Sequence, residues 1–527
     1  MGFLSNILIS KNNEEPNKEI FVFEYGNLGD ERITYKTLYE NSFKVAGELK
    51  RIGIGPGDSF GILMRNYPEF VYLLAAASIV GATVVPVDPR SNGKRLKYMF
   101  GFTEVKVVFT TEDIIQNILD IKSDLPQLRQ IYLVRKSCIR AGTHNEFPFL
   151  NEVIDNNPVP AIEPVSMDSS YPLEIIFTSG TTGDPKGVVL TQDHLGLYAL
   201  LAQLVWGYNK DDVLYTGLSF THGNAQAVTM VPAMAMGIKA IISPQFTKSR
   251  IWDICRKYGV TTFSLLGGMM AGIYNEPQRP NDADNPVNIV LSAGTPKSLW
   301  QAFEKRFNVL IHEWYGSIEG GFAHKIPGQG PIGSFGKPLE GLMEMKIFDD
   351  NDHECPPHVT GEIVWRMAGE NAKVTYYKNK TASEEKTRGG WLRTGDMGHT
   401  DEDGYFFFDY RRGGGLRRQG EFIQPDYIES VIGEHPDVSE VCVYGIPAAS
   451  GAPGESDLVA AIVPFEGRAL NPADIFRLCK EKLTPNTVPS YIQIVQEIQK
   501  TASEKPLDRV LRDNFNASSD NVYKVEI

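Results

Sequence analysis

The sequence has few cysteines, no run of basic residues and no disulfide or zinc pattern. Its five cysteines are an odd number, scattered without a CxxC pair, so neither a disulfide framework nor a zinc site is expected. Asp and Glu outnumber Lys and Arg by 65 to 52, which gives a formal net charge of −13. This acidic balance argues against nucleic acid as a partner. We therefore expect a protein of the reducing cytoplasm.

Two apolar segments resemble membrane signals. The start, MGFLSNILISKNNEEP, lacks the basic region and cleavage site of a signal peptide, and Asn6 departs from the myristoylation pattern. Residues 70–87 are apolar enough to be weighed as a membrane span. However, Asn66 as an N-cap, Pro68 in the first turn and Gly81 as a stop signal indicate a buried helix followed by a strand. No membrane span is expected.

A chain of 527 residues, 42% of them hydrophobic, is too long for one core and suggests at least two domains. Short β-branched runs alternate with helical stretches before residue 330, which predicts parallel α/β sheets with ligands beyond the carboxyl ends of their strands. Glycine-spaced strands then indicate a β subdomain. We expect an N-terminal body of residues 1–410 and a small mobile α+β lid of residues 411–527. The glycines 413–415 are either its hinge or an ordinary surface loop.

The segment TSGTTGDPKG, residues 178–187, packs three glycines, four hydroxyl residues and one lysine into ten positions. Such a loop presents backbone N–H groups with little side-chain obstruction, as phosphate oxygens require. Lys186 precedes the last glycine, and an apolar strand-like run follows it, so the order is not that of a Walker loop. We expect a hairpin over the phosphates of a nucleotide, with a purely structural polar hairpin as the alternative.

This loop resembles the signature of the superfamily of AMP-forming acyl-CoA synthetases, adenylation domains and firefly luciferase. Further segments resemble other motifs of that superfamily and follow in the same order. They are LSFTHGNAQ at 218–226, SAGTP at 292–296, YGSIE at 315–319, and then GEIVWR, WLRTGDMG, GYFFFDYRR, QGEFIQPDYIE and KTASEKPLDR. The segment FTHG stands where amino-acid-activating domains carry an FDxS-like segment, which favours the CoA-ligase branch.

The resemblance implies a reaction in two halves, with ATP, Mg²⁺ and CoA as cofactor and co-substrates and a small carboxylic acid as the acyl donor. The carboxylate attacks ATP to form an acyl-adenylate and pyrophosphate, and the CoA thiol then displaces AMP. Charge builds on the α-phosphate, so cations and N–H donors matter most. The resemblance makes Lys505, Lys186 and His222 the catalytic residues, while Thr181 and Glu319 would place Mg²⁺, which prefers oxygen ligands.

The resemblance also implies which residues bind each substrate. Asp396 and Arg411 would hold the ribose, and Tyr315 would offer a flat face to adenine. The expected ATP or AMP site comprises Thr178, Ser179, Gly180, Thr181, Thr182, Gly183, Lys186, Gly294, Thr295, Pro296, Trp314, Tyr315, Gly316, Ser317, Ile318, Asp396, Phe408, Arg411 and Lys505. The expected CoA site comprises Arg417, Arg418, Gln419 and Gly420. The expected acyl pocket comprises His222, Asn224, Gln226, Gly267, Met270 and Gly316.

Three positions depart from the superfamily pattern. Ile318 stands where Thr is usual, Gly414 where the hinge is usually Asp or Lys, and Glu504 where Gly usually precedes the lysine. These departures leave a non-catalytic nucleotide-binding homologue open. An enzyme that loads a carrier-protein thiol is a second alternative. In its motifs the chain looks nearest to carnitine/crotonobetaine-CoA ligase-like and short- to medium-chain members. The LLGGMMAG segment favours an apolar acyl pocket, whereas Asn224 and Gln226 favour a polar acid. Whether the protein forms a homodimer stays open.

Overall fold

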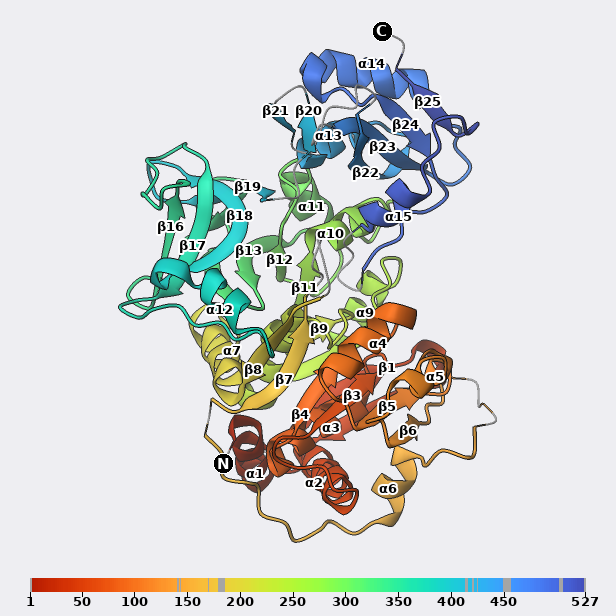
Figure 1. Cartoon of the computed structure of the whole chain (residues 1–527), viewed down its shortest axis with the longest axis vertical. Helices are drawn as coiled ribbons and strands as arrows, with labels where there is room; N and C mark the ends of the chain where they lie inside the picture. Colours follow the sequence, from red (N-terminus) through yellow and green to blue (C-terminus); the bar gives the residue numbers. More distant parts are fainter. Residues whose placement is uncertain are drawn as a thin grey trace.

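Two parallel-rich sheets form the N-terminal body of the protein in the computed structural model of the chain (Figure 1). The structure describes residues 2–139, 142, 144–168, 170–178, 185–412, 416–418, 421–423, 425–448, 456–501 and 506–525. The first sheet has the strand order β14 (Gly320–Lys325), β13 (Leu310–Ser317), β12 (Ile289–Ala293), β11 (Thr262–Leu266), β9 (Val213–Thr216), β10 (Lys239–Ile242), β1 (Glu19–Glu24) and β2 (Asp30–Thr34). The second has the order β6 (Gln130–Val134), β5 (Val107–Thr111), β3 (Ser59–Leu63), β4 (Thr83–Pro86), β7 (Pro172–Phe177) and β8 (Gly187–Thr191).

Antiparallel pairs occur only at the sheet edges among these described strands. β2 pairs antiparallel with β1, β14 with β13, and β8 with β7, while the other pairs of the two sheets are parallel. Helices connect parallel strands, as such crossovers require. The helices of the body are α1 (Phe3–Glu14), α2 (Tyr35–Arg51), α3 (Pro68–Val80), α4 (Gly93–Phe102), α5 (Ile115–Leu119), α6 (Leu150–Asn156), α7 (Gln192–Leu204), α8 (Val231–Met236), α9 (Ile251–Tyr258), α10 (Gly267–Tyr274) and α11 (Trp300–Phe307), with a π-helix η3 (Ala225–Met230) before α8.

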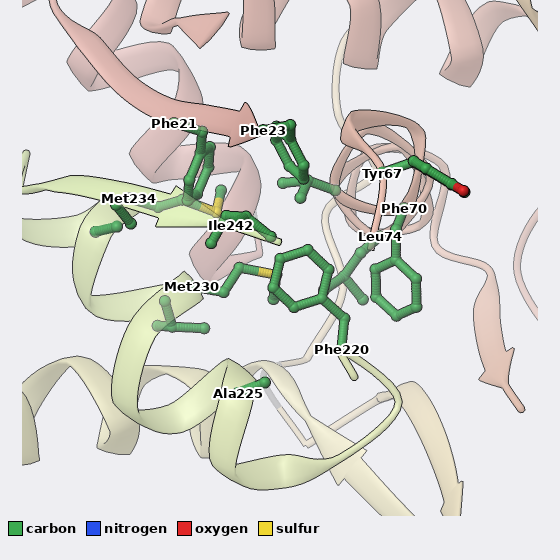
Figure 2. Packing of buried hydrophobic residues seen from close by; sticks show 14 of the residues in the cluster. Phe21, Phe23, Tyr67, Phe70, Leu74, Phe220, Ala225, Met230, Met234 and Ile242 are labelled. Carbon is green, nitrogen blue, oxygen red and sulfur yellow. The ribbon is translucent and has the colours of Figure 1, made fainter. Parts of the chain in front are cut away.

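The apolar helix α3 is buried at every residue, as expected of a helix that is hydrophobic on all sides. Its Phe70 packs beside Phe220, whose ring centroid is 5.4 Å away, and Phe23 of β1 lies 6.4 Å from Phe220 on another side (Figure 2). Across the described residues, none of the helices combines the length and the apolar character that crossing a bilayer requires. The expected pairing of a buried helix with a following strand is therefore found in α3 and β4.

The two ends of α3 match the sequence signals with one correction. Gly81 is the C-cap in the left-handed conformation, as expected, and Pro68 is the first helical residue. The N-cap, however, is Tyr67 and not Asn66. The Asn66 side chain instead donates to the carbonyl oxygens of Leu218 (2.8 Å) and Ser243 (3.0 Å) and accepts the Phe220 N–H at 2.8 Å. Asn66 thereby joins the start of α3 to the segment that leads to His222.

The rest of the chain forms the predicted β subdomain and a small α+β unit. The β subdomain is an antiparallel sheet of the order β15 (Ser334–Gly336), β19 (Phe406–Arg411), β18 (Leu392–Thr400), β17 (Gly361–Met367) and β16 (Met343–Phe348), with helix α12 (Lys380–Lys386) beside it. The C-terminal unit contains β20 (Leu416–Arg418), β21 (Glu421–Ile423), α13 (Pro425–Ile432), β22 (Val438–Pro447), β23 (Ser456–Pro464), α14 (Pro472–Lys482), β24 (Tyr491–Ile494), α15 (Asp508–Asp513) and β25 (Val522–Lys524).

The C-terminal unit, drawn in blue, lies at one end of the molecule, and the orange strands β3 to β6 lie at the other (Figure 1). It touches the body at α10, where the side-chain amide of Asn275 donates to the backbone carbonyl of Ser439 at 2.9 Å. The predicted fold class, an α/β body with a β subdomain and a small C-terminal domain, is confirmed. The boundary at residues 410 and 411 stays a prediction, and the glycines 413–415 lie outside the described residues.

Candidate active site

A cavity of about 1300 Å³ is lined by residues of both body sheets, the β subdomain and the C-terminal unit. Pro86 at the end of β4, Phe177 at the end of β7, Leu266 at the end of β11 and Ala293 at the end of β12 are all on its wall. The cavity therefore lies at the carboxyl ends of parallel strands, where open α/β sheets bind their ligands.

The two segments expected to close on the nucleotide both border this cavity. Thr178 and Lys186, which flank the glycine-rich loop, are on the wall, and so are Thr501 and Leu507, which flank the segment of the expected adenylation lysine. The expected site residues between the first pair, and the expected lysine between the second, lie outside the described residues. They are Ser179, Gly180, Thr181, Thr182, Gly183 and Lys505.

The base of the glycine-rich loop is a β-hairpin, as the sequence predicts. The N–H of Thr178 donates to the carbonyl of Lys186 at 3.0 Å, and Phe177 of β7 pairs with Gly187 of β8. A Cβ atom on Gly187 would lie 2.7 Å from Cγ2 of Ile175, so the last glycine allows two strands to approach closely. The Nζ atom of Lys186 lies 5.2 Å from the ring centroid of Tyr376, within the range of a cation–π contact.

The expected ribose-binding residues meet through the pairing of β18 with β19. Asp396 lies opposite Arg411 in this register, and Arg411 Nη1 lies 3.1 Å from Asp396 Oδ1. The phenol of Tyr315 donates to Asp396 Oδ2 at 2.6 Å, and its ring stacks on Phe335 with centroids 4.5 Å apart. Arg411 lines the cavity, whereas Asp396 is buried and does not. Phe408 does not line the cavity either, and 42% of its surface is exposed to solvent.

The expected adenine turn, residues 292–296, is bound by the side chain of Glu313, a residue that the sequence analysis did not name. Glu313 Oε1 accepts the backbone N–H groups of Gly294 (2.7 Å) and Thr295 (3.1 Å), and burial raises the pKa of Glu313 to about 7. A Cβ atom on Gly267 would lie 1.9 Å from the Gly294 carbonyl oxygen, so Gly267 supports this turn by close backbone approach. Ala293 of the preceding strand lines the cavity, while Gly294, Thr295 and Pro296 are not in its lining.

The expected magnesium ligand Glu319 lies on the cavity wall with two residues that sequence reasoning missed. Tyr376 donates from its phenol to Glu319 Oε1 at 3.1 Å, and Lys386 Nζ donates to the Thr394 carbonyl at 3.2 Å. Burial lowers the pKa of Lys386, and the charge of Glu319 opposes that shift. Among the described residues no cluster of three His, Cys, Asp or Glu could hold a metal. One carboxylate on the wall of a large cavity fits Mg²⁺, which binds through one or two carboxylates and substrate phosphates.

The expected acyl pocket is partly on the wall and partly behind it. Of its six residues, His222, Asn224 and Gly316 line the cavity, whereas Gln226, Gly267 and Met270 do not. Trp314, Ser317 and Ile318 of the expected nucleotide site line it as well. His222 Nδ1 accepts the backbone N–H of Asn224 at 3.2 Å, so the neutral imidazole carries its proton on Nε2. Burial lowers the pKa of His222 to about 4, which keeps this ring neutral at physiological pH. The Ile318 side chain packs on Gly223, where a Cβ atom would lie 2.7 Å from Ile318 Cδ1.

Beyond the wall at His222, the cavity is bordered by apolar side chains. The Trp206 ring meets Trp314 and Phe322 edge to face, with centroids 5.7 and 5.6 Å apart. The other residues of this kind on the wall are Leu197, Leu201, Ala227, Val228, Met343, Trp365 and Met367. They come from α7, η3, β16, β17 and the segments beside them, so the sequence offered no contiguous signal for them.

The cavity has a basic edge that the sequence analysis did not predict. Arg90, Lys94 and Arg95, in and just before the first turn of α4, are exposed and line the cavity. Of the residues expected to bind CoA, Arg418 instead donates to the carbonyls of Asn486 (3.3 Å) and Val488 (2.6 Å) within the C-terminal unit. Gln419, Gly420 and the Arg417 side chain lie outside the described residues.

Comparison with known proteins adds a family and relatives of known activity. A family model described as AMP-binding enzyme matches residues 9–377, and one described as AMP-binding enzyme C-terminal domain matches residues 427–505. The steroid-22-oyl-CoA synthetase of Rhodococcus jostii (strain RHA1) is 27% identical over 531 residues, covering 95% of this chain and 92% of its own. The crotonobetaine/carnitine–CoA ligase of Proteus mirabilis (strain HI4320) is 26% identical over 512 residues, covering 94% and 96%. The solved structure of an anthranilate CoA ligase in complex with anthranoyl-AMP has a TM-score of 0.84 at 23% identity and covers 97% of both chains.

Proposed function

Since this chain belongs to the AMP-binding enzyme family, we propose that it joins a carboxylic acid to coenzyme A at the expense of ATP, with AMP and pyrophosphate as the other products. One observation carries the proposal. The residues that flank the glycine-rich loop and those that flank Lys505 line a single cavity, although the two segments are far apart in the sequence. This arrangement supports the proposal that one nucleotide binds between Thr178 and Lys186 on one side and Thr501 and Leu507 on the other.

The first half-reaction forms the acyl-adenylate. A carboxylate oxygen of the acid attacks the α-phosphorus of ATP, and the bond from that phosphorus to the bridging oxygen of pyrophosphate breaks. Negative charge then builds on the α-phosphate oxygens, where fixed cations stabilise it. Lys186, Lys386 and Arg411 are on the cavity wall, and Lys505 would add a fourth cation. Glu319 would hold Mg²⁺ together with phosphate oxygens, which neutralises charge on the departing pyrophosphate.

The second half-reaction forms the thioester. The thiol sulfur of CoA attacks the acyl carbon, the carbon–oxygen bond to AMP breaks, and the thiol loses its proton. His222 would donate from Nε2–H to an oxygen of the acyl group, because its Nδ1 already accepts the Asn224 N–H. The basic edge of Arg90, Lys94 and Arg95 offers charge for the phosphates of CoA.

We propose that the acid carries an apolar body. The carboxylate end would lie near His222, and the body would lie against the aromatic and methionine side chains around Trp206, Phe322 and Trp365. Such walls favour apolar groups and adapt to their shape. The short- to medium-chain acids are therefore the first substrates to test, with a steroid acid and a betaine as wider members of the panel.

The test is a panel of carboxylic acids assayed for ATP–pyrophosphate exchange, and for AMP release with and without CoA. Exchange that depends on one acid, together with AMP and acyl-CoA formed in equal amounts, supports the proposal. Exchange without any acyl-CoA favours transfer to a carrier-protein thiol. Nucleotide binding without exchange for every acid favours a non-catalytic homologue.

A variant separates the two halves. Lys505→Ala is expected to abolish exchange yet keep thioester formation from acyl-adenylate supplied directly, because the lysine acts on the α-phosphate only. Lys480→Ala, an exposed lysine of α14 outside the cavity lining, is the matched control. Equal loss of both halves in Lys505→Ala would contradict the assigned role.

A further inference from the structure

A glutamate is completely buried in the strand that leads into the glycine-rich loop. Glu174 of β7 has no solvent-exposed surface, and neither has Gln226 of η3. Gln226 Nε2 donates to Glu174 Oε1 at 2.8 Å and to the Phe220 carbonyl, also at 2.8 Å. These bonds join β7 to the segment that carries His222 and Asn224, because η3 begins at Ala225.

The remaining oxygen of each group has no partner. Glu174 Oε2 and Gln226 Oε1 are both buried and accept no hydrogen bond from the described residues. Both are acceptors when the glutamate is ionised, so they cannot satisfy one another. A proton on Glu174 changes this, because a carboxylic acid then has one donor and one acceptor, as a primary amide does. Buried polar groups in native proteins are nearly always paired.

We propose that Glu174 is a protonated carboxylic acid in the working enzyme and that it forms two hydrogen bonds with the Gln226 amide, one in each direction. The pair holds the His222 segment on the strand that enters the glycine-rich loop. Glu174 is thus a positioning residue for acid binding, an inference that rests on the proposed ligase function. It acts through Gln226 and does not line the cavity that would hold the substrates.

The surroundings of Glu174 favour the neutral form. Val84 of β4 and Leu190 of β8 lie opposite it in the sheet, and both are apolar and buried. Burial raises the pKa of Glu174 to about 8, and the hydrogen bond from Gln226 opposes that shift. Among the described residues, Tyr198 of α7 is the titratable group whose pKa the charge of Glu174 affects. Burial raises the Tyr198 pKa first, and the Glu174 charge raises it further. Among the residues that the structure describes, no cation offsets the effect of burial on the Glu174 pKa.

Ionisation has a predictable consequence for substrate binding. Above the pKa, Glu174 would lose its donor, and a carboxylate oxygen would face Gln226 Oε1. The His222 segment would then be held by the Gln226 Nε2 bonds alone. The loss of one buried hydrogen bond corresponds to about a threefold to tenfold change in an equilibrium constant. We therefore expect the KM for the acid to rise by that factor between about pH 7 and pH 9, with little change in kcat.

Two substitutions test the pair. Glu174→Gln keeps an amide pair with no titratable proton, so the KM for the acid should stay near the wild-type value at pH 7 and should not rise at alkaline pH. Glu174→Leu removes both bonds and should raise this KM at every pH. Glu384→Gln is the matched control, because Glu384 is an exposed glutamate of α12, and its KM for the acid should follow the wild type at every pH. An alkaline rise that persists unchanged in Glu174→Gln would overturn the proposal, and so would equal KM values for Glu174→Gln and Glu174→Leu at pH 7.

A second measurement does not need activity. The infrared difference spectrum between wild type and Glu174→Gln should show the carbonyl stretch of a protonated carboxyl group at neutral pH. A carboxylate band alone would overturn the proposal, even if Glu174→Leu fails to fold. Because the folded pKa lies above the unfolded one, the folded state binds the extra proton. The wild-type Tm should therefore fall relative to Glu174→Gln as pH rises from about 5 to 8. Because neither the infrared spectrum nor the Tm depends on catalysis, both can refute the protonation of Glu174 independently of whether the protein is a ligase.

Discussion

Tyr315 and Asp396 are joined by a hydrogen bond of 2.6 Å from the phenol to Oδ2 of the carboxylate. They come from different sheets, because Tyr315 lies in β13 of the first body sheet and Asp396 lies in β18 of the β subdomain. The other oxygen of Asp396 is 3.1 Å from Arg411. The carboxylate is therefore held on both sides before any nucleotide enters, which lowers the cost of orienting it on a ribose.

Tyr315→Phe should weaken ATP binding. It removes a hydrogen bond to a charged group while it keeps the ring that stacks on Phe335, and such bonds contribute about 1.5–3 kcal/mol. We expect kcat/KM for ATP to fall about tenfold to a hundredfold and the KM for the acid to stay unchanged. Steady-state kinetics with each substrate varied in turn will measure both. Tyr427→Phe, at an exposed tyrosine of α13, controls for loss of a phenol elsewhere, and a change in the KM for the acid alone would contradict the assignment.

Lys386→Met should slow adenylation, because it removes a cation from the wall that holds Glu319. Burial lowers the pKa of Lys386, so its charge is lost at a lower pH than that of an exposed lysine. The wild-type exchange rate should therefore decline at alkaline pH, whereas Lys386→Arg should retain its rate there, since a guanidinium stays charged. ATP–pyrophosphate exchange across pH 7 to 10 measures this. Lys380→Met, on an 88% exposed side chain of the same helix, should have no effect. An alkaline decline that is the same in Lys386→Arg would show that another group causes it.

Asn66→Asp should destabilise the protein. The side-chain amide donates to two backbone carbonyls, and a carboxylate in that place would face both oxygens without a donor. We expect the free energy of unfolding to fall by about 3 kcal/mol, measured by urea denaturation. The KM for the acid should also rise, because the lost amide bond holds the carbonyl of Leu218, four residues before His222. Asn157→Asp at an exposed position is the control, and equal stability of the two variants would refute this role for Asn66.

His222 should make the folded state sensitive to acid. Burial lowers its folded pKa to about 4, below the unfolded value of about 6.5. The unfolded chain therefore binds a proton first, and the stability that neutral His222 contributes is complete above about pH 6.5 and is lost as pH falls towards 4. The wild-type Tm should consequently fall more than that of His222→Asn between pH 7 and 4.5. His353→Asn, with a side chain exposed at 79%, should follow the wild type. Parallel curves for wild type and His222→Asn would mean that this ring is not held neutral.

The residues of the cavity divide into those that sequence order revealed and those that it did not. The hairpin at Thr178 and the buried helix α3 were predictable, since their turns, glycines and apolar runs are contiguous. Asp396 and Arg411 were named from motifs that the resemblance supplied; the structure pairs them, and their contact with a ribose stays a prediction. Lys386 and the basic edge at Lys94 were not, because a surface helix with several charges shows no sign of which one faces a cavity. Arg418, expected at CoA, donates from Nη1 to two carbonyls of the C-terminal unit, and its contact with CoA stays a prediction.

The sequence by itself determined the local chemistry of this protein, because phosphate loops, turns and strand alternation depend on neighbouring residues. It also determined the family, through the order of its motifs. Only the tertiary structure decided that Thr178 and Lys186 border the same cavity as Thr501 and Leu507, since packing of segments far apart in the sequence brings them there. Only the tertiary structure placed Glu174 among apolar strands beside Gln226. The protonation of a carboxyl group depends on its burial and its partners, and neither can be read from the position of a residue in the chain.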